Sequence, residues 1–391
     1  LGDVYKRQFF IFPSPVTLLM GQAAIIASGL IPLYLICKRH KLSNAAVILF
    51  SLCYVLLPSM ANGCFFFLHE NKFLTPLILW LAFALEKNKW IPSVIFTLLL
   101  LAVKEDAPVY AAVLGLYFIV SRRNISKGAL VFVLSIIYFI TVSYFMSKYG
   151  LGTMSYRYDN FIYDGSGSLF TVIKAVILNP IYTVHEAFDE EKIKFILQML
   201  VPLAFMPLMI KKPSRIILLI PFILLNLMSD YTYQHNINFQ YTYGSAAFLF
   251  YLMILNYQDM KPGFRCKVLA VAATSSIFMF MCNTYYRTSG YESYKTDKNN
   301  GAIDIIDDAL ELVPDDSSVA ATTFLVASLY DHREVYEFES TNHRDEVEYI
   351  VLDLRISSDD FSVDDYLNNP IYETVENKPG YIAIFRNTTV E

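Results

Sequence analysis

Apolar stretches separated by short basic clusters fill residues 9–282, and this pattern constrains the fold more than any other feature of the sequence. Only 17% of the chain is charged, against roughly 25% in soluble domains, and the deficit lies almost entirely in this region. Residues 284–391 instead have the composition of an ordinary soluble domain. We therefore expect a mainly α-helical, polytopic transmembrane bundle over residues 1–283 and a small α/β domain over residues 284–391. In the small domain we expect helices at Ala302–Leu312 and Val363–Asn368 and strands at Val319–Thr323, Glu348–Leu354 and Tyr381–Phe385.

About ten segments are apolar enough to be spanning helices. Three of them, Val16–Ile36, Ala129–Met146 and Ile193–Ile210, approach the ~20 residues that cross a bilayer. Shorter segments are expected to be buried among other helices or to reach the surface at a thinned edge. The remaining segments are Asn44–Pro58, Phe73–Leu85, Ile91–Val103, Ala107–Val120, Ile216–Met228, Ala246–Asn256 and Val268–Cys282.

Lysine and arginine residues set the orientation of these segments. If each segment crosses once, five loops on one side carry basic clusters, while the short loops on the other side carry little more than Lys72 and Lys104. The positive-inside rule places the basic loops in the cytoplasm and the C-terminal domain outside it. The basic clusters are Lys38/Arg39/Lys41, Lys87/Lys89, Arg122/Arg123/Lys127, Lys211/Lys212/Arg215 and Lys261/Arg265/Lys267.

Two charged clusters flank the hairpin formed by Phe73–Leu85 and Ile91–Val103. His69-Glu70 precedes the hairpin and Lys104-Glu105-Asp106 follows it, so both clusters should return to the same outer face. Charges at the mouths of apolar helices cost free energy unless they are paired or hydrated. Lys104 is suited to hold a phosphate, and Glu105, Asp106 or the His69-Glu70 pair to act as general acid or base. Solvated turns and interfacial polar pairs are the simpler alternatives.

Two further outer loops offer candidate ligand contacts. Arg157, between Tyr156 and Tyr158, lies in the long polar interval Ser147–Lys192 and is suited to bind an anion or a sugar. His235 lies in the later polar stretch SDYTYQHNINFQY. For both residues, a solvated loop is the alternative.

Common catalytic motifs are absent from the sequence. It contains no HExxH, P-loop or GxGxxG pattern, and the five cysteines show no paired spacing that would indicate a metal site or a disulfide framework. Basic residues are dispersed over the predicted inner loops, so nothing indicates a nucleic-acid partner. A bilayer is the partner that the composition predicts.

Four stretches resemble a prokaryotic membrane protein family catalogued as domain of unknown function 2079. This family is grouped with the GT-C class of integral membrane glycosyltransferases, which resemble one another in having many helices and a site at the outer membrane face. The matching stretches, within Val16–Arg355, are LPSMANGCFFFLHENKFLTPLILWLAFALEKNKW, LLLLAVKEDAPVYAAVLGLYFIVSRR, VPDDSSVAATTFLVASLYDHREVYEF and EYIVLDLR.

The resemblance implies a multi-pass protein of a prokaryotic plasma membrane that transfers a sugar from a polyprenyl-phosphate-linked donor. On this chain the reaction would fall on His69, Glu70, Lys104, Glu105 and Asp106. A divalent cation ligated by Glu70 and Asp106 is an alternative to Lys104 as the group that holds the phosphate. GT-C enzymes usually place a catalytic Asp or Glu in their first outer loop. This chain begins at Leu1 without a signal peptide, and we expect that loop to lie in a missing N-terminal part.

Two other functions fit the same composition. A transporter or lipid flippase would be expected to keep ionisable groups or broken helices near the midplane, often in paired repeats, whereas the charges here lie at the helix mouths. A non-catalytic protein that displays its outer domain predicts that His69 and Glu105 tolerate substitution.

Overall fold

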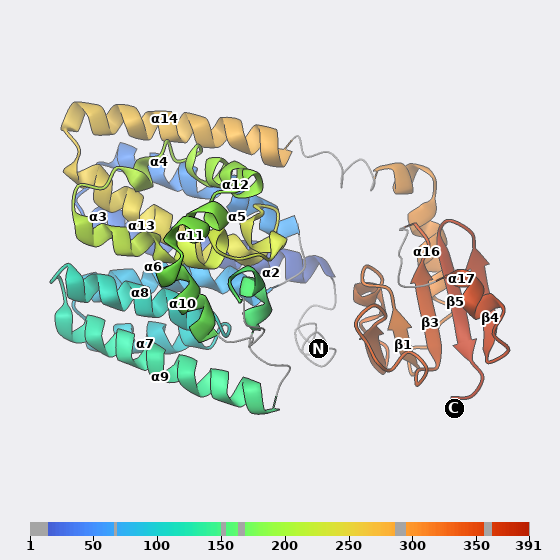
Figure 1. Ribbon diagram of the computed structural model, residues 1–391. Helices are drawn as coiled ribbons and strands as arrows, with labels where there is room; N and C mark the ends of the chain where they lie inside the picture. Colours follow the sequence, from blue (N-terminus) through green and yellow to red (C-terminus); the bar gives the residue numbers. More distant parts are fainter. Residues whose placement is uncertain are drawn as a thin grey trace. The chain divides into compact units, whose positions relative to one another are not determined.

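The computed structural model describes residues 15–65, 69–149, 154–162, 169–285, 295–355 and 362–390. These residues form two compact units, shown in Figure 1. The first, Leu19–Tyr286, is helical. The second contains Arg287–Glu391 and a five-stranded sheet. The prediction of a mainly helical protein with a small sheet domain at its C-terminus is confirmed.

The helical unit has irregular as well as regular helices. Its α-helices are α2 (Pro15–Ser28), α3 (Leu30–Arg39), α4 (Asn44–Val55), α5 (Pro58–Asn62), α6 (Leu74–Glu86), α7 (Trp90–Leu101), α8 (Ala107–Val120), α9 (Ile125–Tyr149), α10 (Leu169–Leu178), α11 (Pro180–Ala187), α12 (Glu190–Leu200), α13 (Tyr243–Asp259) and α14 (Pro262–Phe280). Its short 3-10 helices are η1 (Gly63–Phe65), η2 (Glu70–Phe73), η3 (Met154–Phe161), η4 (Met206–Leu208), η5 (Pro213–Leu219), η7 (Thr232–His235) and η8 (Gln240–Thr242), and its π-helices are η6 (Phe222–Leu227) and η9 (Met281–Tyr285).

Local sequence explains where several helices begin. Ser43 caps α4, with its side chain accepting a hydrogen bond of 3.2 Å from Ala46 N. Asp189 caps α12 in the same way, at 2.8 Å from Lys192 N. Both residues satisfy amide groups that a helix leaves without an internal partner. Pro108 stands at the start of α8, where its missing N–H costs nothing.

Helix α13 forms the centre of the bundle. Every residue from Tyr243 to Tyr257 is buried, because the helix is apolar on all sides and is surrounded by neighbours. Its contacts include α6, η4 and η5. The first residue of α13 follows η8, and its last residue leads into α14. The two ends of this central helix mark the two ends of the bundle.

The prediction of about ten membrane crossings is not met. In the part of the chain that the structure describes, three helices are long and apolar enough to cross: Thr17–Arg39, Ile125–Tyr149 and Pro262–Tyr285. There are four if the pair Asn44–Val55 and Pro58–Phe65, bent by 49°, counts as one span. Helix α7 has 12 residues and α8 has 14, which at 1.5 Å per residue gives roughly 18–21 Å against a hydrocarbon core of ~30 Å. These short apolar segments are folded as the sequence predicts, but they are too short to count as clear spans.

Two glycines allow α8 and α9 to approach closely. A Cβ atom on Gly115 would lie 2.7 Å from the carbonyl oxygen of Gly128, and one on Gly128 would lie 2.7 Å from that of Gly115. Small residues at crossing points are typical of helix pairs in membranes, because they let the backbones touch. In α9 (Ile125–Tyr149), only 11% of the most apolar window is buried inside the protein, so the rest of this helix has the surface expected against lipid.

Glu86 joins three of the basic loops at one end of the bundle. Its carboxylate lies 3.2 Å from Arg39 Nε, 2.8 Å from His40 Nε2 and 3.3 Å from Arg123 Nη1. It also accepts a hydrogen bond of 2.8 Å from Tyr251 of α13. A buried carboxylate in contact with these groups holds the ends of α3, α6 and α8 together.

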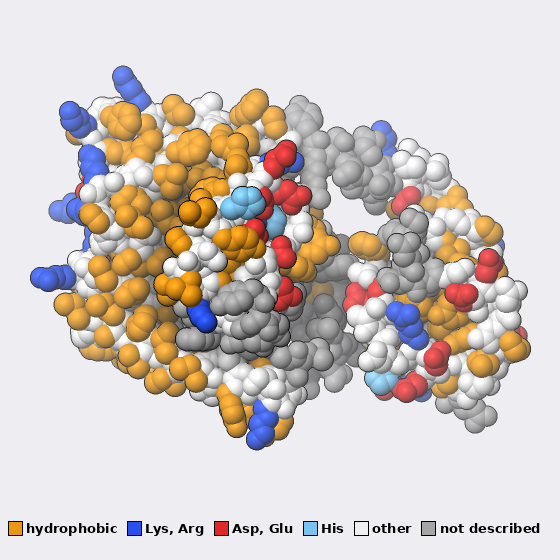
Figure 2. All heavy atoms as spheres, viewed as in Figure 1, with side chains coloured by type: hydrophobic (Ala, Val, Ile, Leu, Met, Phe, Trp, Pro, Cys, Tyr) orange, Lys and Arg blue, Asp and Glu red, His pale blue; other side chains and the backbone are white. Residues whose placement is uncertain are grey.

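Asp259 brings the other two basic loops to the same end. It lies 2.6 Å from Arg215 Nη1 and 3.3 Å from Lys212 Nζ, at the turn between α13 and α14. Figure 2 shows lysine and arginine side chains gathered at the end of the bundle where α14 begins. The five basic clusters therefore share one end, as the sequence predicts.

The C-terminal unit is built on a mixed sheet with strand order β2-β1-β3-β5-β4. Strand β1 pairs in parallel with β2 and β3, and β5 pairs antiparallel with β3 and β4. The elements are α16 (Ala302–Leu310), β1 (Ser318–Ala321), η10 (Val326–Leu329), β2 (Glu334–Glu337), β3 (Tyr349–Asp353), α17 (Val363–Leu367), β4 (Tyr372–Lys378) and β5 (Ile382–Asn387).

Alternating residues of the central strands form a core on each face of this sheet. Val319 and Val351 pack with Ile306 of α16 on one face. Ala320 and Ile350 belong to the core on the other face. This is the period of two expected for strands buried on both sides. Strands β1, β3 and β5 and helices α16 and α17 lie where the sequence predicts them, whereas β2 and β4 were not predicted.

Candidate functional site

Four segments bring polar side chains to the end of the bundle opposite the basic clusters. They are η2 before α6, the turn between α7 and α8, η3, and the stretch between η6 and α13. Helix α6 runs from this end to Glu86 at the basic end, and α8 runs in the same sense. Figure 2 shows acidic and histidine side chains at this end of the bundle.

Lys104 and Glu70 meet across the α6–α7 hairpin. Lys104 Nζ lies 3.2 Å from Glu70 Oε1, and Glu70 Oε2 lies 3.0 Å from His69 Nδ1. The Lys104 side chain is 7% exposed, whereas that of Glu70 is 44% exposed, so the lysine is shielded from water and the carboxylate remains open to it. The prediction that the two charged clusters return to the same face is confirmed.

Burial and cations keep His69 neutral. Burial lowers the pKa of His69 well below its ordinary value, and Lys104, Lys72 and Arg157 act in the same direction, while Glu70 opposes them. His69 also accepts a long hydrogen bond, 3.5 Å, from Asn71 N at the start of η2. At neutral pH this imidazole is therefore uncharged.

Tyr241 connects Lys104 to Arg157. Lys104 Nζ lies 5.4 Å from the centre of the Tyr241 ring, and Arg157 Cζ lies 5.3 Å from it. Arg157 Cζ is also 5.3 Å from the centre of the Tyr231 ring. Cations within about 6 Å of an aromatic face are attracted to it. Two cations from distant segments are thus held around one ring. Together they supply the positive charge that an anionic ligand requires.

Backbone contacts fix Arg157 in this position. Its carbonyl oxygen accepts hydrogen bonds of 2.8 Å from Asp230 N and 3.2 Å from Ser229 Oγ. The Gln234 side-chain amide has one orientation in which both its oxygen and its nitrogen find hydrogen-bond partners. In this orientation the Gln234 oxygen accepts a hydrogen bond of 2.9 Å from Arg157 Nη1. The side chain is 4% exposed, so this guanidinium is preorganised rather than free in solvent.

Asp106 provides a carboxyl group beside these cations. It stands at the N-cap of α8, yet its side chain makes no capping hydrogen bond, and its buried Oδ1 has no hydrogen-bond partner among the described residues. Burial raises the pKa of Asp106 to about 6; Glu105 and Glu70 act in the same direction, and Lys104 and Arg157 oppose it. A carboxyl group of this pKa can accept a proton near neutral pH.

The other two candidates, Glu105 and His235, lie in different surroundings. Glu105 influences Asp106 electrostatically, and its Oε1 is buried without a partner in the part of the chain that the structure describes. His235 instead lies against α12, with Nε2 3.6 Å from Glu191 Oε2. Burial and then Lys192 lower the pKa of His235. His69, Glu70, Lys104, Asp106 and Arg157 are thus brought together, whereas His235 belongs to a neighbouring cluster.

A comparison with protein families places the chain. The family described as Predicted membrane protein (DUF2079) matches residues 9–382. The chain belongs to this family. No curated protein and no solved structure matches it. The matched range includes both units and every candidate residue above, and membership assigns the protein to a membrane.

Three residues near this site were not predicted to take part in it. Tyr231 and Gln234 contact Arg157, and the only signal for them is the density of aromatic and amide side chains in SDYTYQHNINFQY. Lys72 is fully buried, and burial lowers its pKa to about 8, with Cys64 and Glu70 opposing. In the sequence Lys72 looks like an ordinary charge in an outer loop.

Glu70, one of the two residues expected to ligate a divalent cation, is already paired with other groups. Both carboxylate oxygens of Glu70 already lie near Lys104 and His69. Among the described residues, the one group of three potential metal ligands within reach of a common ion lies in the C-terminal unit. In the bundle, Lys104 and Arg157 are the cations that lie around the Tyr241 ring.

Proposed function

We propose that this membrane protein transfers a sugar from a polyprenyl-phosphate-linked donor to an acceptor hydroxyl, at the outer end of its helix bundle. One observation carries the proposal: Lys104 and Arg157 lie around the Tyr241 ring beside a buried carboxyl, Asp106, whose pKa is raised to about 6. These are an anion-binding pair and a base in one place.

The surface next to Arg157 suits a donor that arrives in the bilayer. Helix α10 contacts η3, which carries Arg157, and α10 and α11 present apolar side chains outward. Ile181 is 87% exposed and Ile177 is 71% exposed. Amphipathic helices of this kind lie in the membrane interface. A polyprenyl chain could therefore stay in lipid while its phosphate reaches the cations.

The proposed reaction is a displacement at the anomeric carbon. The acceptor oxygen forms a bond to C1 of the sugar while the bond from C1 to the phosphate oxygen breaks, and the electron pair leaves with the polyprenyl phosphate. Lys104 and Arg157 stabilise the charge that develops on the phosphate. Asp106 takes the hydroxyl proton, so the products are the glycosylated acceptor, polyprenyl phosphate and a protonated carboxyl.

The orientation of the site is part of the proposal. All five basic clusters gather at the opposite end of the bundle, and the positive-inside rule assigns that end to the cytoplasm. The candidate site would then face outward, and so would the C-terminal unit, which follows α14 on the same side of the chain's last apolar helix.

The proposal is tested with the purified chain in vesicles that contain radiolabelled polyprenyl-phosphate sugars. We expect label to leave the lipid and appear on an acceptor. Lys104→Met should reduce this transfer at least a hundredfold, because one developing-charge contact is worth roughly that factor. Lys148→Met, at an exposed lysine in the last turn of α9, is the matched control and should leave transfer unchanged. Equal transfer by both variants would exclude Lys104 from the site.

A transporter or lipid flippase is the second candidate, favoured by irregular helices. The α4–α5 pair is bent by 49°, and η6 is a π-helix; broken helices often form transport sites. The same vesicles separate the two functions. Labelled lipid that reaches the other leaflet with its sugar intact would indicate a flippase and would contradict the transferase.

A further inference from the structure

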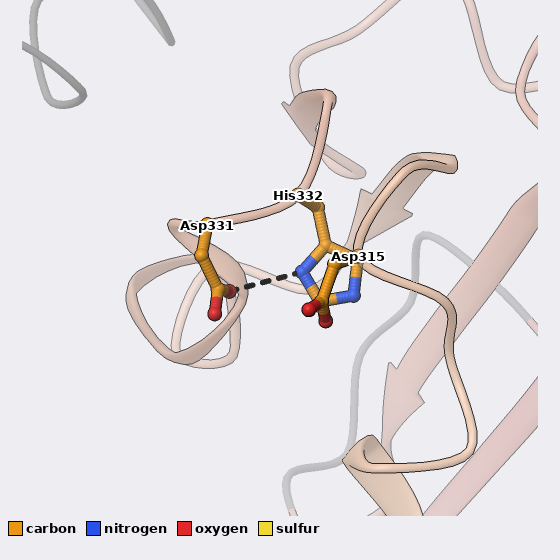
Figure 3. Close-up of side chains that lie close together, drawn as sticks. All are labelled: Asp315, Asp331 and His332. Atoms are coloured by element: carbon orange, nitrogen blue, oxygen red, sulfur yellow. Dashed lines mark hydrogen bonds and ion pairs between the residues drawn. The ribbon is translucent and has the colours of Figure 1, made fainter.

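The C-terminal unit holds a cluster that is independent of the bundle site. Asp315 lies in the turn before β1, and Asp331 and His332 lie in the turn before β2. One ligand atom from each residue lies within 4.8 Å of the others. Figure 3 shows the two carboxylates and the imidazole brought together from these two turns.

The hydrogen bonds of His332 fix which ring nitrogen carries a proton. Nε2 lies 3.2 Å from the carbonyl oxygen of Val313, and because a carbonyl can only accept, Nε2 must donate. In the neutral ring Nδ1 then carries a lone pair. That lone pair faces Asp331 Oδ1 at 3.3 Å, which is also an acceptor. The two atoms can therefore share one cation, either a metal ion or a proton on Nδ1.

The separation of these atoms is that of two ligands on one metal ion. Ligands that are each about 2.0–2.2 Å from a shared ion, at tetrahedral or octahedral angles, lie roughly 2.8–3.6 Å apart. The distance of 3.3 Å between Nδ1 and Oδ1 falls in this range. The donation from Nε2 to a backbone carbonyl is also the outer contact that orients metal-binding histidines.

The site is preorganised by the backbone. Arg333 N donates a hydrogen bond of 2.9 Å to the carbonyl oxygen of Asp315, so the two turns are joined directly. The Arg333 guanidinium lies 2.9 Å from Glu348. The His332 side chain is 5% exposed, whereas that of Asp331 is 53% exposed. A buried, oriented imidazole thus points toward carboxylates that are open to solvent, through which an ion can enter.

We infer that Asp315, Asp331 and His332 bind a divalent transition-metal ion, of the class of Zn²⁺ or Mn²⁺, that braces the edge of the sheet. Imidazole with carboxylate is a ligand set that suits these ions. The site lies at the amino ends of the parallel strands β1 and β2, which pair from Ser318 and Glu334 onward. Ligands of open α/β sheets bind at the carboxyl ends, so this ion is structural, fastening the edge strand β2 to β1.

Electron paramagnetic resonance of Mn²⁺ added to the metal-free, full-length protein in detergent tests this inference. We expect one bound ion per chain, with nitrogen modulation from His332. Asp331→Asn and Asp315→Asn, which preserve side-chain shape, should each weaken binding at least tenfold, and His332→Gln should abolish the nitrogen signal. Asp316→Asn, the exposed neighbour outside the cluster, is the control and should bind as the parent does.

Three results would overturn the inference. One is no bound ion at millimolar Mn²⁺ or Zn²⁺. Another is a bound ion without nitrogen modulation, or with the same affinity in Asp331→Asn. The third is a ¹⁵N nuclear magnetic resonance signal showing His332 doubly protonated in the presence of Zn²⁺, because the cation between the two acceptors would then be a proton.

Discussion

At the residue scale, the protonation of Asp106 should govern the reaction. Below its pKa the carboxyl is protonated and cannot accept the acceptor's proton, so transfer should fall as the pH drops below about 6. Above that pH the rate should level off. Glu105→Gln removes a negative neighbour that raises the pKa of Asp106. The acidic limb of the pH–rate profile, where the transfer rate falls, should therefore move to lower pH. The measurement is transfer rate against pH; a limb that stays in place would exclude this coupling.

Arg157 should shift the same limb in the opposite direction. Its positive charge holds the pKa of Asp106 down, so Arg157→Gln should raise that pKa and move the acidic limb to higher pH. The maximal rate should also fall, because one contact to the phosphate is lost. The pH profile separates this role from a structural one, since a merely loosened site would lower the rate without shifting the limb upward.

The sequence predicts part of this site and not the rest. Lys104 and Glu70 could be placed together because one hairpin separates them along the chain. The contact between Arg157 and Tyr241 could not be predicted, since it depends on how η3 packs against the stretch before α13. The environment of Asp106 was also hidden, because in the sequence it is one of three charges in what looks like a solvated turn.

At the scale of elements, the contact between α8 and α9 depends on glycine. Gly128→Ala would place a Cβ atom 2.7 Å from the carbonyl oxygen of Gly115, and the backbones would have to separate. Overpacking of this kind typically costs about 1–3 kcal/mol. We expect a lower midpoint of thermal unfolding in detergent, followed by intrinsic fluorescence.

Gly21→Ala is the matched control for that variant. Gly21 lies in α2, and a Cβ atom there would meet nothing within 4 Å, so helix propensity alone should keep or raise stability. A Gly128→Ala protein as stable as Gly21→Ala would show that the α8–α9 contact is not tight.

Strands β2 and β4 were not predicted from the sequence, and the reason is the same for both. Strand β2 (EVYE) and strand β4 (YETVENK) lie at the two edges of the sheet and alternate polar with apolar residues only weakly. Buried strands such as β3 (YIVLD) carry a stronger apolar signal and were predicted. Similarly, apolar composition located the short helices α7 and α8, but it could not tell burial in protein from contact with lipid.

At the scale of the whole molecule, the proposed orientation predicts which groups face outward. On a background with the native cysteines replaced by serine, Asp365→Cys in the C-terminal unit should react with a membrane-impermeant maleimide in intact cells. Lys87→Cys, in the α6–α7 turn at the basic end, should react only after the membrane is permeabilised. Both side chains are exposed, so access alone decides the labelling. The reverse pattern would contradict the proposed orientation.

The most direct test of the central claim is a single-turnover measurement of sugar transfer from a pre-bound polyprenyl-phosphate donor. We expect Asp106→Asn to lower the rate constant about a hundredfold or more while donor binding is retained, because only the proton acceptor is lost. Asp159→Asn, an exposed carboxylate on η3, should transfer at the parent rate. If Asp106→Asn transfers the sugar as fast as Asp159→Asn, then Asp106 is not the base and the proposed site is contradicted.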